Sequence, residues 1–187
     1  MRVDNQLSRR NFLAGVTAAG ASRLFPAQAQ SNKAQRIDVH HHITPPAFIS
    51  FLKERGQGAP IAWTLEKSLQ DMEEGGTATA ITSITSPGIW FPPVEGVRKV
   101  ARDCNDYAAK LRADYPGRFG IFATLPLPDI EGSIRETEYA LDTLKADGVC
   151  LWTNYLDKWL GDAQFNPLYE ELNRRKAIVY THPKQAD

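Results

Sequence analysis

The sequence predicts a (β/α)8 barrel of the TIM type, of which residues 30–187 carry the first five or so β/α units. From residue 36 onward, short runs of β-branched residues alternate with helical patterns, and this alternation is typical of a parallel sheet with helical crossovers. Histidines stand at the ends of the first and the last predicted strands, where this barrel places its functional groups. The chain ends four residues after the last strand, whereas a complete barrel takes about 250 residues. We therefore expect a truncated barrel in place of the alternative, an open doubly wound sheet.

The first predicted elements are a strand and two helices. Residues 36–41, RIDVHH, are rich in β-branched side chains and predict the first strand. A helix follows over 46–56, with Pro46 near its start and Gly56 past its end. Thr64 is a suitable N-cap for the next helix, which two consecutive glycines stop.

The later elements follow the same alternation. Residues 77–85, TATAITSIT, are rich in Thr and Ile and predict the second strand. Residues 94–115 carry an apolar stripe at helical spacing and predict a long helix. The remaining predicted strands are 118–125, 148–153 and 177–183, with helices over 129–146 and 165–176 between them.

A different kind of segment precedes the barrel region. Residues 8–13, SRRNFL, contain paired arginines, a weakly hydrophobic stretch follows, and the small-residue site Ala27-Gln28-Ala29 ends the segment. This order is that of an export signal, and SRRNFL resembles the twin-arginine motif of bacterial Tat signals. We expect the Tat export machinery to recognise residues 1–29 and cleavage to fall near Gln30, which makes the mature protein periplasmic. A helical or unstructured arm is the alternative.

Charge and composition limit the partners. The 187 residues include 22 Lys and Arg and 22 Asp and Glu, so the formal net charge is zero. This balance gives no broad attraction to nucleic acid or to an anionic membrane. No apolar run reaches the roughly 18 residues that a membrane span requires. The two cysteines do not make a disulfide framework.

The run of three histidines at the end of the first strand predicts a metal site. Strand side chains alternate between faces, so His40 and His42 point one way and His41 the other. Neutral imidazole is a good ligand for zinc and related divalent metals. His182, at the end of the last predicted strand, lies on the same rim of the barrel, and we expect it to share one ion with His40 and His42. We expect His41 to make packing or hydrogen-bonding contacts outside the barrel. Asp38 shares the face of His40 one step deeper, either as support for a ligand histidine or as a hydrogen-bonded structural carboxylate.

Aromatic residues in two predicted strand-to-helix loops are candidates for binding a substrate. Trp90 and Phe91 follow the second strand, and Trp152, Asn154 and Tyr155 lie at the end of the fourth. Because these loops form the functional face of a barrel, such side chains suit a flat aromatic or unsaturated acid. The alternative is that they pack the loops against the barrel.

Three stretches resemble a known family. IDVHHHITPP is similar to the opening signature of the amidohydrolase superfamily, in its amidohydrolase-related branch. NDYAAKLRADYPGRFGIFATLPLPD continues the likeness, and so does GVCLWTNYLDKWLGDAQFNPLYEELNRRKAIVYTHP. The resemblance runs from Arg36 to Pro183. Its last part looks most like sequences assigned as 6-methylsalicylate decarboxylase-like.

The resemblance implies a metal-dependent hydrolase type of barrel with a defined ligand set. His40 and His42 match the first two metal ligands of the family, and His182 matches the ligand on the fifth strand. The family adds a catalytic His and a metal-binding Asp on later strands, at positions beyond Asp187, so the catalytic residues are unknown and the activity of the chain by itself stays open. The resemblance implies zinc as the first choice of metal and manganese as the second.

The same resemblance leaves three functions open. The first is nonoxidative decarboxylation of a small aromatic or unsaturated carboxylic acid, a carbon–carbon lyase reaction. The second is metal-dependent hydrolysis of a lactone, amide or ester on the same barrel. The third is a truncated, non-catalytic protein that binds a metal or a partner. Because relatives often dimerise, a homodimer is a further expectation.

Overall fold

The computed structural model describes residues 36–58, 62–91 and 93–184. The chain divides into the units Met1–Lys33 and Ala34–Asp187, and all described residues belong to the second. The predicted export signal at residues 1–29 lies outside the described residues. Within the described ranges, no helix combines the length and the apolar character that crossing a membrane requires.

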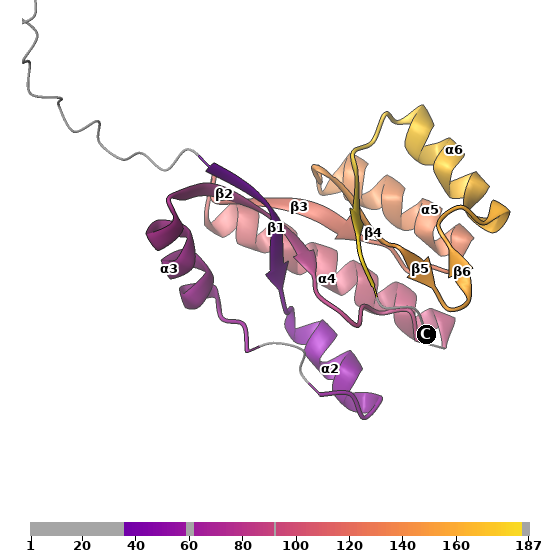
Figure 1. Ribbon diagram of the computed structural model, residues 1–187, viewed down its shortest axis with the longest axis horizontal. Helices are drawn as coiled ribbons and strands as arrows, with labels where there is room; N and C mark the ends of the chain where they lie inside the picture. The colour runs from indigo at the N-terminus through magenta and orange to yellow at the C-terminus, as the bar shows by residue number, and fades with distance from the viewer. Residues whose placement is uncertain (1–35, 59–61, 92, 185–187) are drawn as a thin grey trace, which may run out of the picture. The chain divides into compact units, whose positions relative to one another are not determined.

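A parallel sheet forms the centre of the described unit (Figure 1). Its five strands lie in the order β1-β2-β3-β4-β7, and every neighbouring pair is parallel. The strands are β1 (Arg36–Ile43), β2 (Thr77–Ile84), β3 (Phe119–Thr124), β4 (Gly148–Trp152) and β7 (Val179–His182). Consecutive parallel strands joined by helices, in a sheet that curls, make part of a (β/α)8 barrel. The predicted fold class is therefore confirmed.

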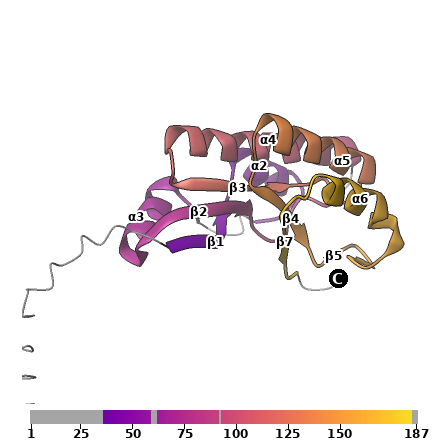
Figure 2. The same ribbon diagram turned by 90° about the horizontal axis from the view of Figure 1, so that it is seen from above.

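Helices connect the strands and cover one face of the sheet. Figure 2 shows α4 and α5 side by side on this face. The helices are α2 (Pro46–Glu54), α3 (Leu65–Gly75), α4 (Val94–Asp114), α5 (Ile130–Glu138) and α6 (Asn166–Arg174), with a 3-10 turn η2 (Ala163–Phe165) before α6. Buried side chains from helices and strands form the core between the two layers, including Phe48, Met72, Ile121, Leu151 and Leu168.

Capping residues set the helix ends as the sequence predicts. The hydroxyl of Thr64 accepts the N–H of Lys67 at 3.1 Å, which satisfies a main-chain donor in the first turn of α3. Gly76 ends the same helix with φ +65°, a conformation that glycine adopts without strain. Asp129 caps α5 by accepting the N–H of Gly132 at 3.1 Å. Proline stands in the first turn of α2 and of α6.

Two local features differ from the prediction. The helix expected over 129–146 is α-helical only to Glu138 and then widens into a π-helical turn, η1 (Tyr139–Thr143). The ring of Tyr139, at the start of this turn, lies on the guanidinium of Arg102, whose carbon is 3.5 Å from the ring centre. The loop after β4 contains a short hairpin that was not predicted, of β5 (Asn154–Tyr155) and β6 (Lys158–Trp159).

Strand β1 contains an extra residue that changes which side chains share a face. Asp38 pairs with Ala80, but His41 pairs with Thr82, so three steps along β1 correspond to two steps along β2. A bulge of this kind shifts the alternation of side chains by one position. The prediction that Asp38 shares the face of His40 assumed strict alternation along the strand, and the bulge between Asp38 and His41 interrupts that alternation.

Candidate metal centre

The side chains of His40, His42 and His182 meet at one point. The Nε2 atoms of His40 and His42 are 3.1 Å apart, and those of His40 and His182 are 2.9 Å apart. The Nε2 atoms of His42 and His182 are 3.0 Å apart. The structure thus brings together the three histidines that the sequence predicted as one site, and they form a cluster able to hold a metal ion.

Curvature of the sheet makes this meeting happen. The cluster joins β1 and β7, which are the two edge strands of the five-stranded sheet. In a flat sheet, four strand spacings of about 4.8 Å would separate these edges by about 19 Å. The sheet therefore curls as a barrel wall does, and it brings residues 40 and 182 into contact across 142 positions of sequence.

Hydrogen bonding alone cannot satisfy the three facing nitrogens. Each Nε2 of a neutral imidazole either donates or accepts. With three mutual contacts, at least one pair must consist of two donors or of two acceptors. His182 is assigned as an acceptor there, because its Nδ1 lies 2.7 Å from the carbonyl oxygen of Pro183 and must carry the proton. A cation that accepts all three lone pairs removes the conflict.

The spacing also fits the ligand set of one ion. Two imidazole nitrogens bound at about 2.0–2.1 Å to the same ion lie roughly 2.9–3.4 Å apart at right-angled to tetrahedral geometry. The observed separations of 2.9–3.1 Å fall in this interval. The residues present therefore fit a divalent metal.

The electrostatics keep His42 in the form that binds metal. Burial and, to a smaller extent, the neighbouring rings of His182 and His40 together lower the pKa of His42 from 6.5 to about 4. At neutral pH the His42 ring is therefore uncharged and keeps a free lone pair. A protonated imidazole has no lone pair to give to an ion.

Ser83 lies behind His42, on the side away from the cluster. His42 and Ser83 are register partners on β1 and β2, and the His42 Nδ1 is 3.3 Å from the Ser83 Oγ. The Ser83 side chain also affects the pKa of the Cys150 thiol on β4. Burial raises the pKa of Cys150 to about 12, so the thiol stays uncharged.

His41 and Asp38 form a separate pair of contacts. The Nε2 of His41 is 2.5 Å from the Oγ of Ser68 on α3, and its Nδ1 is 3.3 Å from the Asp38 carboxylate. Asp38 also accepts the main-chain N–H of His40 at 2.9 Å. His41 therefore bonds outward to a helix, as predicted, and Asp38 has a structural role that orders the bulged part of β1.

Two of the predicted aromatic residues lie near the end of β7: Trp152 contacts His182 of the cluster, and Trp90 contacts Lys184, two residues further on. The ring of Trp152 is buried and meets the ring of His182 at 4.8 Å in a T-shaped contact. Trp90 is half-buried, stacks on Phe91 at 4.5 Å and carries the Lys184 ammonium 3.8 Å from its ring centre. These contacts place aromatic surface and a positive charge around the carboxyl end of β7.

Asn154 and Tyr155 occupy buried positions. Tyr155 is 2% exposed and Asn154 is 1% exposed. The Tyr155 hydroxyl accepts the main-chain N–H of Trp152 at 2.9 Å, and its ring packs against Phe165. Tyr155 was predicted to bind a substrate, with packing of the loop as the alternative. The structure supports the packing role, because a ring enclosed in this way offers no surface to a ligand.

Ser83 and Lys184 lie at the site but were not predicted from the sequence as site residues. A signal for Ser83 was present, because it is a polar residue near the carboxyl end of a parallel strand next to the His-x-His strand. Lys184 follows His182 by two positions, and its main-chain N–H donates to the Thr153 Oγ at 3.0 Å. This bond ties the loop after β7 to the loop after β4.

Fold and site together define a class: a chain of the (β/α)8 barrel type with a histidine cluster at the carboxyl ends of its strands. Comparison with known families gives the same answer. The family model described as amidohydrolase matches residues 37–186. The chain belongs to this amidohydrolase family.

Named relatives within the family are decarboxylases. Decarboxylase yanB of Aspergillus niger is 48% identical over 159 residues, which cover 79% of this chain and 43% of that protein. The 6-methylsalicylic acid decarboxylase of Penicillium expansum is 41% identical over 157 residues, which cover 79% of this chain and 48% of that protein. The chain therefore spans a little under half the length of these curated relatives.

Solved structures share the fold. A crystal structure described as amidohydrolase II matches with a TM-score of 0.76 at 29% identity, over 81% of this chain and 51% of that one. A dihydroxybenzoic acid decarboxylase from Polaromonas, solved with bound manganese and an inhibitor, matches with a TM-score of 0.68 at 23% identity, over 81% and 50% of the two chains.

Proposed function

We propose that the chain is the metal-bearing part of a nonoxidative decarboxylase that acts on a small aromatic or unsaturated carboxylic acid. The observation that carries the proposal is the meeting of His40, His42 and His182 at 2.9–3.1 Å on the functional rim of the barrel. Relatives named as decarboxylases support the choice of reaction. The substrate named for the Penicillium expansum relative, 6-methylsalicylic acid, is the first compound to test.

Zinc is our first candidate for the ion and manganese our second. Three neutral imidazoles suit zinc, and the Polaromonas structure with bound manganese supports the second choice. A divalent ion at this site supplies a positive charge that binds the carboxylate and a neighbouring hydroxyl of an aromatic acid.

The chain's own residues hold the ion and shape the surroundings. His42 stays uncharged because burial lowers its pKa to about 4. The carbonyl of Pro183 accepts the Nδ1–H of His182, and this bond turns the other ring nitrogen toward the cluster. The T-shaped contact of Trp152 limits rotation of the same ring. The Lys184 ammonium over Trp90 adds a positive field that favours an anionic, flat substrate.

Release of carbon dioxide tests the proposal. The full-length protein that contains this chain, purified from cells that express it, is loaded with zinc or manganese and incubated with 6-methylsalicylate. We expect metal-dependent carbon dioxide release that chelation abolishes and readdition of the metal restores. His41→Ala is the matched control for His42→Ala, because His41 is the neighbouring imidazole that bonds outward to Ser68. If the protein instead opens a lactone without releasing carbon dioxide, the decarboxylase proposal is wrong and the alternative, a hydrolase on the same barrel, takes its place.

We further propose that residues 1–29 direct Tat-dependent export and that the mature protein is periplasmic. The motif SRRNFL and the site Ala27-Gln28-Ala29 support this proposal. Mass spectrometry of periplasmic protein should find an N-terminus near Gln30, and replacing both arginines with lysines should retain the protein in the cytoplasm. Exported protein that still begins at Met1 contradicts the proposal. The homodimer also stays a prediction, and light scattering of the purified protein tests it.

A further inference from the structure

Ser83 has no role in the site as derived from the sequence, yet it is placed to control one ligand of the cluster. It is 3% exposed, so water does not compete for its hydroxyl. The Ser83 Oγ is 3.3 Å from the His42 Nδ1, the ring nitrogen that faces away from the other two histidines. A ligand histidine needs its second nitrogen held in this way, because that bond fixes the ring orientation and the tautomer.

The hydrogen bonds around Ser83 have a consistent direction when His42 binds an ion. Coordination through Nε2 leaves the proton on Nδ1, and Nδ1–H then donates to the Ser83 Oγ. The Ser83 hydroxyl keeps its own proton, which it can donate to the Cys150 sulfur. His42, Ser83 and Cys150 lie on β1, β2 and β4 of the same sheet.

We propose that Ser83 is a positioning residue for the metal site, which holds His42 as the Nδ1–H tautomer with its Nε2 directed at the ion. The inference rests on the proposed function in that it requires an ion at the cluster. It does not require decarboxylation.

The structure offers a matched control for this inference. Ser68 is also 3% exposed and also bonds a histidine, because its Oγ is 2.5 Å from the His41 Nε2. His41 points away from the cluster. Ser68→Ala therefore removes a buried serine–histidine hydrogen bond of the same kind without touching a predicted ligand.

The experiment measures zinc affinity of the purified protein by competition with a chelating dye. Ser83→Val and Ser83→Thr have nearly equal volume, and only Thr keeps the hydroxyl. We expect Ser83→Val to bind zinc about 10–100-fold more weakly, the usual effect of removing an outer hydrogen-bond partner. Ser83→Thr and Ser68→Ala should stay within about threefold of the native protein. Equal affinity of the Val and Thr variants overturns the inference, and so does an equal loss in Ser83→Val and Ser68→Ala.

A second measurement needs no variant at Ser83. In zinc-loaded native protein labelled with nitrogen-15 at histidine, the Nδ1–H of His42 should exchange slowly with solvent, because it is hydrogen-bonded to the buried Ser83 hydroxyl. Exchange as fast as that of a free imidazole overturns the inference. If the variants show the expected order of zinc affinities but the native protein releases no carbon dioxide, only the decarboxylase proposal is refuted. If carbon dioxide is released but Ser83→Val binds zinc as tightly as the native protein, only the role of Ser83 is refuted.

Discussion

The substitution Asn105→Ala tests whether a buried amide holds the carboxyl end of β3 in place. Asn105 lies on α4, is 2% exposed, and bonds both main-chain groups of Thr124, the last residue of β3. Its Nδ2 donates to the Thr124 carbonyl at 2.9 Å, and its Oδ1 accepts the Thr124 N–H at 2.8 Å. The pairing of β2 with β3 ends at Thr82 and Ile121, so the amide takes the place of a neighbouring strand at this point.

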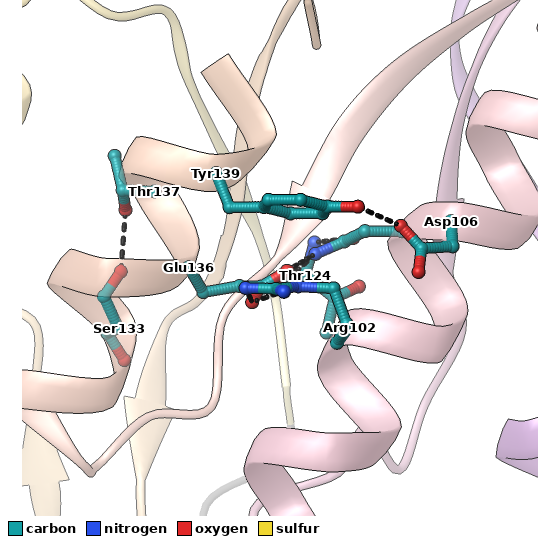
Figure 3. A network of polar contacts seen from close by, with 8 residues as sticks. Arg102, Asp106, Thr124, Ser133, Glu136, Thr137 and Tyr139 are labelled. Carbon is teal, nitrogen blue, oxygen red and sulfur yellow. Dashed lines mark hydrogen bonds and ion pairs between the residues drawn. The ribbon is translucent and has the colours of Figure 1, made fainter. Parts of the chain in front are cut away.

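A buried carboxylate shares the same amide. The Asn105 Nδ2 also donates to the Glu136 Oε1 at 2.8 Å, and the Arg102 Nε donates to the Glu136 Oε2 at 2.9 Å. Figure 3 shows Glu136 and Arg102 between α4 and α5, beneath the ring of Tyr139. The network thus joins two helices to the rim of the sheet.

Counting the lost bonds gives the expected magnitude. Asn105→Ala leaves two main-chain groups of Thr124 without their amide partner and removes one donor from Glu136. Each buried group left unsatisfied costs about 1–3 kcal/mol. Because Glu136 keeps its bond from Arg102, we count the two Thr124 groups and expect the free energy of unfolding to fall by about 2–6 kcal/mol, a large share of the roughly 5–15 kcal/mol that stabilises a domain.

Urea unfolding followed by circular dichroism measures this loss. Asn173→Ala on α6 is the control, because Asn173 is exposed and its removal should change stability by less than about 0.5 kcal/mol. The slope of the unfolding free energy against urea should stay unchanged. A loss below about 1 kcal/mol for Asn105→Ala would refute the reasoning, since it would mean that water or a rearranged neighbour satisfies Thr124 equally well.

Four further changes have definite outcomes. His182→Ala removes one imidazole of the cluster, so zinc affinity by dye competition should fall by more than about 100-fold, and a value within tenfold of native contradicts the shared site. Gly148→Ala places a methyl group against the main-chain carbonyl oxygen of Ile178, the residue before β7, so urea unfolding should show a loss of at least about 1–3 kcal/mol. Unchanged stability would mean that β7 shifts freely. The His42 pKa of about 4 lies below the ordinary 6.5, so between these pH values the unfolded chain binds more protons than the folded one. The urea midpoint of metal-free protein should therefore decrease as the pH is lowered from 6.5 to 4. His42→Gln should make the midpoint less dependent on pH in this range, and an equal dependence in variant and native protein counts against the pKa shift. Thr64→Ala removes the N-cap of α3 and should cost about 1 kcal/mol, which thermal unfolding resolves.

The arrangement of strands and helices was predictable because local chemistry determines it. Runs of Thr, Ile and Val mark β1 and β2, and an N-capping hydroxyl and a left-handed glycine delimit α3. The histidine cluster was predictable for a different reason. Carboxyl ends of parallel strands meet on one rim of a barrel, so His-x-His after the first strand and His182 at the last strand had to lie on the same side.

The features that escaped prediction depend on backbone geometry with no sequence signal of its own. The β5–β6 hairpin turns through Leu156 and Asp157, and Leu156 adopts φ +54°. Such turns usually carry Asn or Gly at positions of positive φ, and neither residue stands at Leu156 or Asp157 to predict a hairpin. The burial of Tyr155 follows from this turn, because the hairpin folds its ring back under the loop and against Phe165.

Because the histidine cluster joins the two edge strands, metal binding should depend on the curvature of the sheet. Two histidines of the cluster lie on one edge strand and the third lies on the opposite edge strand, so an ion could contact all three only when the sheet is curled. A preformed site of this kind does not exist in the unfolded chain, so the free energy of metal binding adds to that of folding. Contacts that hold the rim of the sheet far from the ion, such as the bonds from Asn105 to Thr124, should therefore affect metal affinity as well as stability. The outer-shell bond from Ser83 acts differently, because it orients a single ring. A loss of affinity without a loss of stability distinguishes this local effect from a change in the curvature of the sheet.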